Sequence, residues 1–421
     1  MRNRRASVVF VLITLFIDIL GMGLVIPILP RLVQSLLGGA IGEASFVYGL
    51  LLSLYAVMQF LCAPLLGALS DRFGRRPIIL IALAGLGVDY VLLSFAPSIG
   101  WLVVGRTVAG VLGATYTPAG AYIADVSPPE KRAANFGLVG LAFGLGFIAG
   151  PALGGLLGQS NLRLPFMVCA VLTLCNFLFG LLVMPESLRP ENRRTVNWAQ
   201  TNPVGALRAV WRHRSVAMIL PIFLVAQLAQ QMLQSVWVPY TSYRYDWSVT
   251  DVGLSLAIVG LLFALSQGAL VRPIVARFGE LRTLMIALVV AVFGMLLFGL
   301  ATQGWMMYAF TALYCLGLGL LNPSAQGLMS RLVPANEQGL LQGAMTSVMT
   351  GSMIVAPPVA NGLFAMFISP QAPVNLPGAP FFLGSVLCLL ALLLAARQLS
   401  PAKVSPTSHA EPDVLFEATA A

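Results

Sequence analysis

About twelve apolar segments, each about 20 residues long, constrain this chain more than any other feature, because a helix of that length crosses the hydrocarbon core of a bilayer. They lie at 7–29, 46–68, 78–96, 100–122, 134–158, 164–184, 216–241, 251–272, 283–301, 304–327, 341–367 and 379–398. Backbone polar groups in lipid must be satisfied within the segment, so such segments cross as helices. The sequence therefore predicts an all-α membrane protein with about twelve transmembrane helices.

Composition and charge agree with this prediction. The chain is 58% hydrophobic and 9% charged, whereas soluble domains are roughly 45–50% apolar and 25% charged. If the N-terminus is cytoplasmic, about 20 of the 24 Lys and Arg residues fall on the inside, and only Arg31, Arg163 and Arg244 lie outside. The net charge of +9 then reflects topology and not nucleic-acid binding. We expect both termini on the cytoplasmic side of the inner membrane.

A weak internal repeat divides the chain into halves. The pairs are Arg72-Phe73-Gly74 with Arg277-Phe278-Gly279, Trp101 with Trp305, Pro118 with Pro323, Pro128 with Pro334, Gly137 with Gly343 and Pro151 with Pro357, at offsets of 204 to 206. Parallel six-plus-six repeats are the construction of major facilitator transporters. We expect six-helix bundles at 1–184 and 216–398, a cytoplasmic linker at 185–215 and a disordered cytoplasmic tail at 399–421.

Three charges lie inside the predicted spans, away from the ends of these segments: Asp18, Asp89 and Arg106. A carboxylate at the centre of a membrane helix costs about 2.5–3.5 kcal/mol, and acids retained there are candidates for proton or ion sites. The alternatives are plainer: each acid could be a structural hydrogen-bonding group, and Arg106 could extend to the interface. The hypothesis that we carry forward is proton coupling at these three residues.

Two short motifs suggest how the halves move. The loop GALSDRFGRRP follows the second span, and its charged residues can staple helix ends together. It closely resembles the major facilitator loop signature, which implies a gating role for Gly67, Asp71, Arg72, Gly74, Arg75 and Arg76. The second motif, GLGFIAGPALGG in the fifth span, permits close helix packing. It resembles the antiporter motif of the same superfamily, carried here by Gly146, Gly150, Pro151 and Gly154.

A stripe of glutamines marks one face of the seventh span. Gln227, Gln231 and Gln234 are spaced four and three residues apart, so they share a helix face. Hydrogen bonding between helices would explain them, and so would a substrate cavity. We expect a large, mostly apolar cavity for an amphipathic solute, with walls formed by Gln59, Tyr116, Gln227, Gln231, Gln234, Trp237, Gln267, Asn322 and Gln326.

Taken together, LFIDILGMGLVIPILP, ALSDRFGRRP, GVDYVLLSFAP, GRTVAGVLGATYTPAGAYIAD and FGLGFIAGP resemble the tetracycline/proton antiporters among the major facilitators. The resemblance implies proton transfer at Arg106 and matches the acids Asp18 and Asp89. It is dense over about residues 8–160 and thins in the second half. There the acid of the family's ninth span is missing, with Ala291 nearest to its position, and Phe263 lies where the family has a histidine.

Other classes fit less well. The only lysines, Lys131 and Lys403, do not lie in a P-loop motif, which argues against an ATP-driven pump. His and Cys show no metal-ligand spacing, so we expect no enzyme, no metal and no cofactor. The function predicted is proton-coupled export of a small amphipathic compound or drug, tetracycline-like or multidrug, by a monomer. The alternative is a proton symporter or facilitator that imports a small nutrient.

Overall fold

The computed structural model describes residues 2–113, 116–193, 214–331, 333 and 338–398. Helices make up its regular structure, and none of these residues forms a strand, which confirms the all-α prediction. Most of the expected linker and the whole of the expected tail lie outside the described residues.

Six membrane-crossing segments form the first bundle. A short helix, α2 (Leu29–Leu37), lies between the first two of them, and a single 3₁₀ turn (Pro190–Asn192) follows the sixth. The six segments are α1 (Arg2–Val25), α3 (Ile41–Phe73), α4 (Arg75–Ser94), α5 (Ile99–Leu112) with α6 (Tyr116–Val126), α7 (Pro129–Ser160) and α8 (Leu164–Val183).

The second bundle repeats this pattern. Its elements are α10 (Arg214–Tyr245), α11 (Val249–Leu265), the π-helical turn η3 (Ser266–Leu270), α12 (Val271–Leu300), α13 (Gly304–Leu318), α14 (Leu321–Ser330), α15 (Gln338–Ile368) and α16 (Ala379–Gln398). The run Val249–Leu300 is continuous by hydropathy, yet 52 helical residues would extend about 78 Å. Gly279, with φ 74° and ψ 165°, breaks the run into two spans. Eleven candidate helices among the described residues thus give twelve crossings.

Local geometry supports the internal repeat. Gly74 has φ 108° and ψ 158°, close to the values of its counterpart Gly279. These angles lie in a region open essentially to glycine alone. In each half the preceding arginine covers the neighbouring ring: the guanidinium lies 5.1 Å from the Phe73 centroid and 5.5 Å from the Phe278 centroid. The duplicated motif therefore makes the same turn twice.

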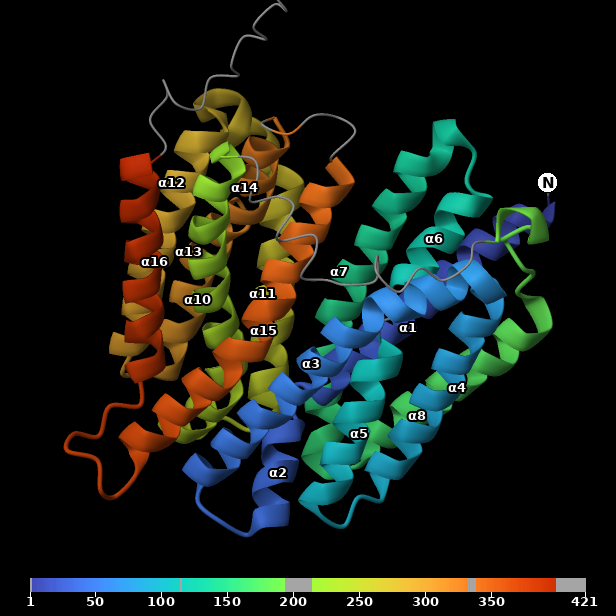
Figure 1. Cartoon of the computed structure of the whole chain (residues 1–421). Coiled ribbons are helices and arrows are strands. Elements are labelled where there is room, and N and C mark those ends of the chain that lie inside the picture. The colour runs from blue at the N-terminus through green and yellow to red at the C-terminus, as the bar shows by residue number, and fades with distance from the viewer. Residues whose placement is uncertain (1, 114–115, 194–213, 332, 334–337, 399–421) are drawn as a thin grey trace, which may run out of the picture.

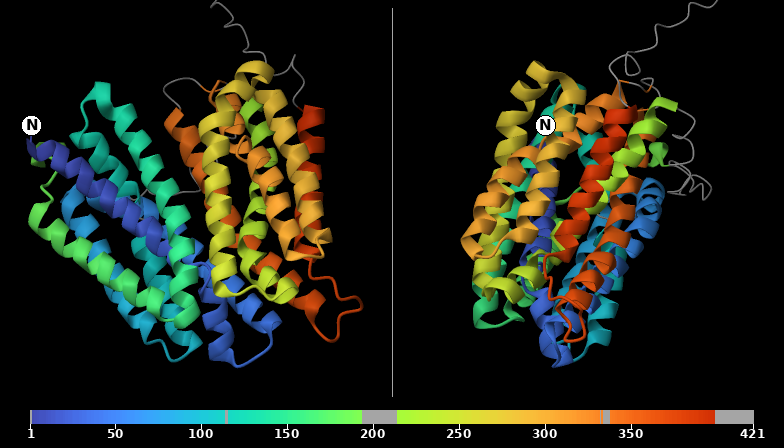
Figure 2. Two further views of the ribbon diagram at one scale, coloured as in Figure 1. Left: turned by 180° about the vertical axis from the view of Figure 1, so that it is seen from behind. Right: turned by 90° about the vertical axis from the view of Figure 1, so that its left-hand side faces the viewer.

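The two bundles meet at one end and lean apart at the other (Figures 1 and 2). We call the end near α2 the sealed end, and the end that carries the N-terminus the open end. Packing of α3 on α15 and of α7 on α11 joins the bundles. Toward the open end of α7, added Cβ atoms on Gly137, Gly140 and Gly144 would meet nothing within 4 Å. The space between the bundles therefore opens toward one face of the membrane.

Hydrogen bonds reinforce the sealed end. Asn361 of α15 is fully buried; its side-chain oxygen accepts a 2.7 Å bond from Ser45 of α3, and its amide donates to the Pro357 carbonyl at 2.9 Å. Ser53, two turns further along α3, donates to the Ile354 carbonyl. Buried bonds of this kind hold one helix of each bundle in register.

Candidate functional site

Asp89 and Arg106 are buried charges in the first bundle. Asp89 is 1% exposed and Arg106 9%, and neither Asp89 carboxylate oxygen has a hydrogen-bond partner. A Cβ on Gly105 would lie 2.9 Å from Asp89 Oδ1, so a glycine is required for the carboxylate to approach α5 this closely. The two side chains also interact electrostatically. An unpaired acid at this depth is costly, as expected of a functional group.

Asp18 belongs to the same region. It is half-buried on α1 and interacts electrostatically with Tyr55 of α3 and Tyr90 of α4, both of which also feel the charge of Arg106. The Tyr90 hydroxyl would lie 2.9 Å from a Cβ on Gly21, one turn beyond Asp18. Asp18 and Arg106 therefore act on the same two tyrosines, and Asp89 interacts with Arg106, so the three intramembrane charges form one electrostatically linked cluster among α1, α3, α4 and α5.

The small residues of the fifth span pack against α1. A Cβ on Gly146 would lie 3.0 Å from the Ile19 side chain, one on Gly150 2.8 Å from the Gly23 Cα, and one on Gly154 2.4 Å from the Leu24 carbonyl. A larger residue at Gly150 or Gly154 would meet the backbone of α1 and move this helix away, and one at Gly146 would have to shift Ile19 by a few tenths of an ångström. One face of α7 is therefore fixed against the helix that carries Asp18.

The opposite face of the same motif joins the bundles. The Pro151 carbonyl would lie 2.3 Å from a Cβ on Gly253 of α11, and a Cβ on Gly155 would lie 2.8 Å from the Val249 carbonyl. Thr250 donates to the Gly155 carbonyl at 3.2 Å. The motif thus packs α7 on α1 within the first bundle and on α11 of the second. Separation of the bundles at the sealed end must break the contact between α7 and α11, which we call the seam.

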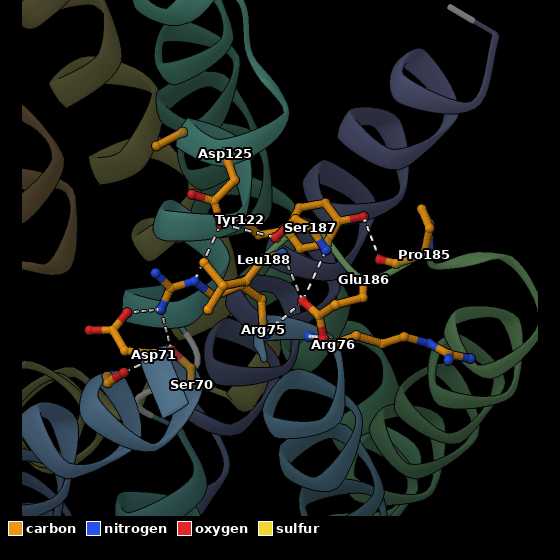
Figure 3. A network of polar contacts seen from close by, with 12 residues as sticks. Ser70, Asp71, Arg75, Arg76, Tyr122, Asp125, Pro185, Glu186, Ser187 and Leu188 are labelled. Carbon is orange, nitrogen blue, oxygen red and sulfur yellow. Dashed lines mark hydrogen bonds and ion pairs between the residues drawn. The ribbon is translucent and has the colours of Figure 1, made fainter. Parts of the chain in front are cut away.

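The loop GALSDRFGRRP, for which the sequence predicts a gating role, forms a polar network at the open end (Figure 3). Arg75 of α4 forms an ion pair with Asp71 of α3, donates a 2.6 Å hydrogen bond to Ser70 and contacts Asp125 of α6 at 3.4 Å. Gly67 of α3 packs against α6, with Thr117 3.3 Å from an added Cβ. The motif residues and Asp125 therefore link the ends of three helices.

Glu186, just beyond α8, completes this network (Figure 3). Its carboxylate accepts backbone N–H bonds from Arg75 at 2.9 Å and Arg76 at 3.3 Å, and from Ser187 at 2.9 Å and Leu188 at 3.0 Å. It thereby caps the N-terminus of α4, where the helix dipole favours an anion. The Arg76 guanidinium donates to a carbonyl of α8 at 2.8 Å, and Arg72 covers Phe73. Sequence reasoning missed Glu186 and Asp125; the Pro-Glu-Ser directly after the sixth span was the available signal.

The second half has a simpler counterpart. Glu280 lies in α12, just before the ninth span of the chain. It forms an ion pair with Arg331 at the end of α14, with 2.6 Å between Oε1 and a guanidinium nitrogen. Glu280 also packs over Gly327, where an added Cβ would lie 3.2 Å from its Cγ. Sequence reasoning did not single out either residue, because they lie 51 residues apart.

The candidate substrate residues are dispersed in this conformation. Gln59 is half-buried and donates to the Tyr55 hydroxyl at 3.3 Å. Gln227 is buried and its side-chain oxygen has no partner; the same holds for the side-chain oxygen of Asn322. The Tyr116 side chain lies outside the described part of the chain. Gln231 is half-buried, and Gln234, Gln267 and Gln326 are exposed.

Two positions lie inside the second bundle. The Trp237 indole is 4% exposed, donates to Ser255 at 3.0 Å and packs edge-on against Phe298. It is a core residue here and does not line an opening, which differs from the expectation for a cavity wall. Ala291, the position without the family's acid, is fully buried in the same core.

Comparisons with known proteins agree with this architecture. The sequence profile of the Major Facilitator Superfamily matches residues 11–273 and 219–418. The class C tetracycline resistance protein of Escherichia coli is 40% identical over 365 residues, which cover 87% of this chain and 91% of that protein. The class G protein of Vibrio anguillarum is 37% identical over 393 residues, covering 93% and 98%.

Solved structures share the fold. A human organic anion transporter superposes with a TM-score of 0.70 at 24% identity, covering 93% of this chain and 99% of its own. A D-xylose–proton symporter gives 0.74 at 17% identity, covering 95% and 99%. The chain therefore belongs to the major facilitator superfamily, as a multi-pass membrane transporter related to the tetracycline resistance proteins and not an enzyme.

Proposed function

We propose that this protein is a proton-coupled antiporter that exports a small amphipathic compound, tetracycline-like or multidrug in class, across the cytoplasmic membrane. The observation that carries the proposal is the cluster formed by the half-buried Asp18 and the buried Asp89 and Arg106, beside the contact between α1 and α7. The relatives at 37–40% identity are tetracycline resistance proteins, which favours export over uptake.

Proton coupling is assigned to Asp18. When the cavity faces outward, Asp18 takes a proton from outside, and the neutral acid tolerates a dry, closed state. Inward opening releases the proton and returns the charge to water. A membrane potential contributes about 2.3 kcal/mol per charge per 100 mV, so a cycle in which the acid alternates its exposure can use that energy. Asp89 and Arg106 share the proton or adjust the acidity of Asp18.

Alternating access is the proposed motion. With both termini cytoplasmic, the open end faces the cytoplasm and the structure is inward-open. The two bundles, 1–184 and 216–398, are joined by the cytoplasmic segment 185–215. A rocking motion of these bundles would break the seam between Gly155 and Gly253 and close the open end. The inner gating network of Asp71 and Arg75 would control that step, and a monomer suffices for the cycle.

The chemical class of the substrate is inferred from two polar side chains in the second bundle. Gln227 and Asn322 offer buried oxygens without partners, which suits a solute with one or two donors in an apolar cavity. Because Ala291 replaces the family's ninth-span acid, we expect neutral or cationic amphiphiles to be better substrates than tetracycline. Substrate entry would have to expose these groups, since both lie within the bundle here.

The sign of proton movement tests the proposal. In everted vesicles with an acidified lumen, an antiporter given substrate outside carries protons out, so the lumen becomes less acidic. A nutrient symporter, the alternative function, would carry protons in with the substrate. A scaffold without transport activity would change nothing. Lumenal alkalinisation on addition of an amphiphile supports antiport, and acidification would favour import.

A further inference from the structure

The open end carries the same ion pair twice, with its charges reversed. In the first half Arg75 contacts Asp125 at 3.4 Å, and in the second Glu280 contacts Arg331 at 2.6 Å. Arg75 and Glu280 are repeat equivalents at an offset of 205, and Asp125 and Arg331 at 206. Each position therefore keeps an ion pair but exchanges acid for base.

The reversal has no advantage within a bundle. An arginine–carboxylate pair on the protein surface contributes the same in either order. The order matters for a contact between the halves, which are related by an axis along the membrane normal. A residue near such an axis meets its own equivalent. An unchanged duplication would then bring like charges together, whereas the reversed order brings Asp125 toward Arg331.

The sealed end shows that the bundles meet in this symmetric way. There α3 packs on α15, and α7 packs on α11. These are the second and eleventh spans and the fifth and eighth, and the repeat exchanges one pair for the other. The contacts at the sealed end therefore obey the two-fold relation between the halves. If closure of the open end keeps this relation, elements that lie on the axis meet their own repeat equivalents.

Both side chains are placed to take part. The Arg331 side chain is 68% exposed and contacts Glu280 through one guanidinium nitrogen, so further donors remain. The Asp125 side chain is 26% exposed. Their helices, α6 and α14, lie on opposite sides of the opening (Figure 1). Of the equivalents Gly120 and Gln326 on those helices, Gln326 is exposed and Gly120 is half-buried, with no atom within 4 Å of an added Cβ.

We propose that Asp125 and Arg331 pair with one another across the axis when the open end closes, while Arg75 and Glu280 hold them in position. The inference rests on the alternating access proposed above but on neither the substrate nor the proton. Opening toward the cytoplasm then breaks one ion pair between the bundles, and closing restores it.

Cysteine cross-linking tests the approach of the two positions. In a full-length background without the five native cysteines, Asp125→Cys with Arg331→Cys is oxidised in membranes, with and without Gly253→Ala. The added methyl would lie 2.3 Å from the Pro151 carbonyl, so it should force the sealed end apart. Gly351→Ala, with open space around it, is the matched control. Ser45→Cys with Asn361→Cys reports on the sealed end.

We expect Gly253→Ala to lower cross-linking at the sealed end and raise it severalfold between positions 125 and 331. If the sealed end opens but the inner pair does not cross-link, the inference is wrong and alternating access stands. If neither pair responds, alternating access fails and the inference falls with it.

Charge exchange tests the attraction itself. Arg331→Glu should slow transport, and adding Asp125→Lys should restore part of the rate. Pairs within the bundles cannot produce this rescue, because the exchange places like charges in both of them. Absence of any rescue, with both variants inserted normally in the membrane, would overturn the proposed pairing.

Discussion

The turn at Gly74 offers a quantitative test of the gating network, because the repeat supplies its own control. Gly74 and Gly279 share a backbone conformation that costs about 1–3 kcal/mol for other residues. A Cβ on Gly279 would meet nothing within 4 Å, whereas one on Gly74 would lie 2.2 Å from Glu186 Oε2. Gly279→Ala therefore imposes backbone strain alone, and Gly74→Ala also displaces the carboxylate.

The displaced carboxylate accepts four backbone N–H bonds. Hydrogen bonds to a charged group contribute about 1.5–3 kcal/mol each when buried, but water reaches this end of α4. We therefore expect a loss of about 1–2 kcal/mol, the size of a helix cap. Gly74→Ala should be less stable than Gly279→Ala by that amount, which corresponds to a difference of roughly 2–8 °C in the unfolding midpoint of a bundle of this size.

Thermal unfolding of the purified variants in detergent measures this difference. A double-mutant cycle with Glu186→Ala isolates the contact: once the carboxylate is absent, Gly74→Ala should cost no more than Gly279→Ala. Equal midpoints for the two glycine variants in the parental background would refute the idea that Glu186 caps α4 with appreciable energy.

Three further predictions concern gating, sealing and selectivity. Asp71→Asn or Arg75→Cys should impair transport but leave membrane insertion intact, because the ion pair links helix ends outside the lipid; a parental transport rate for purified Asp71→Asn would contradict this role. Ser45→Ala removes a bond of about 1 kcal/mol from the sealed end, so a cysteine reporter there should become roughly fivefold more accessible; unchanged labelling would count against it. Expression in a drug-sensitive host should raise tetracycline resistance little, since Ala291 replaces the acid, and a large energy-dependent rise would overturn this expectation.

Local sequence properties predicted the spans and the repeat. Length and hydropathy determine whether a segment crosses lipid, and a twelve-span fold follows from them even though Val249–Leu300 is one continuous apolar run that only the kink at Gly279 divides. The charges Asp18, Asp89 and Arg106 could also be found in the sequence, because a charge inside an apolar segment is visible there, but their proximity to one another could not.

Contacts between segments that are far apart in the chain could not be predicted from the sequence. Glu186 lies in a polar stretch beyond the sixth span, and nothing local shows that its carboxylate meets α4, 111 residues earlier. Helical spacing predicted that the glutamines of α10 share one face, but not which part of the protein that face contacts. Trp237 was expected to line a cavity, and it lies in the core of the second bundle. Periodicity defines a face, and only tertiary packing defines its neighbour.

Proton coupling at Asp18 is tested most directly by solute-induced proton movement in everted vesicles that contain the Asp18→Asn variant. The amide keeps the size of the side chain but carries no exchangeable charge, so expression and solute exchange without net proton movement should persist. We predict that an amphiphile that alkalinises the lumen through the parental protein will have no such effect through the variant. If the variant still couples solute to protons, the proton carrier lies elsewhere, with Asp89 the next candidate.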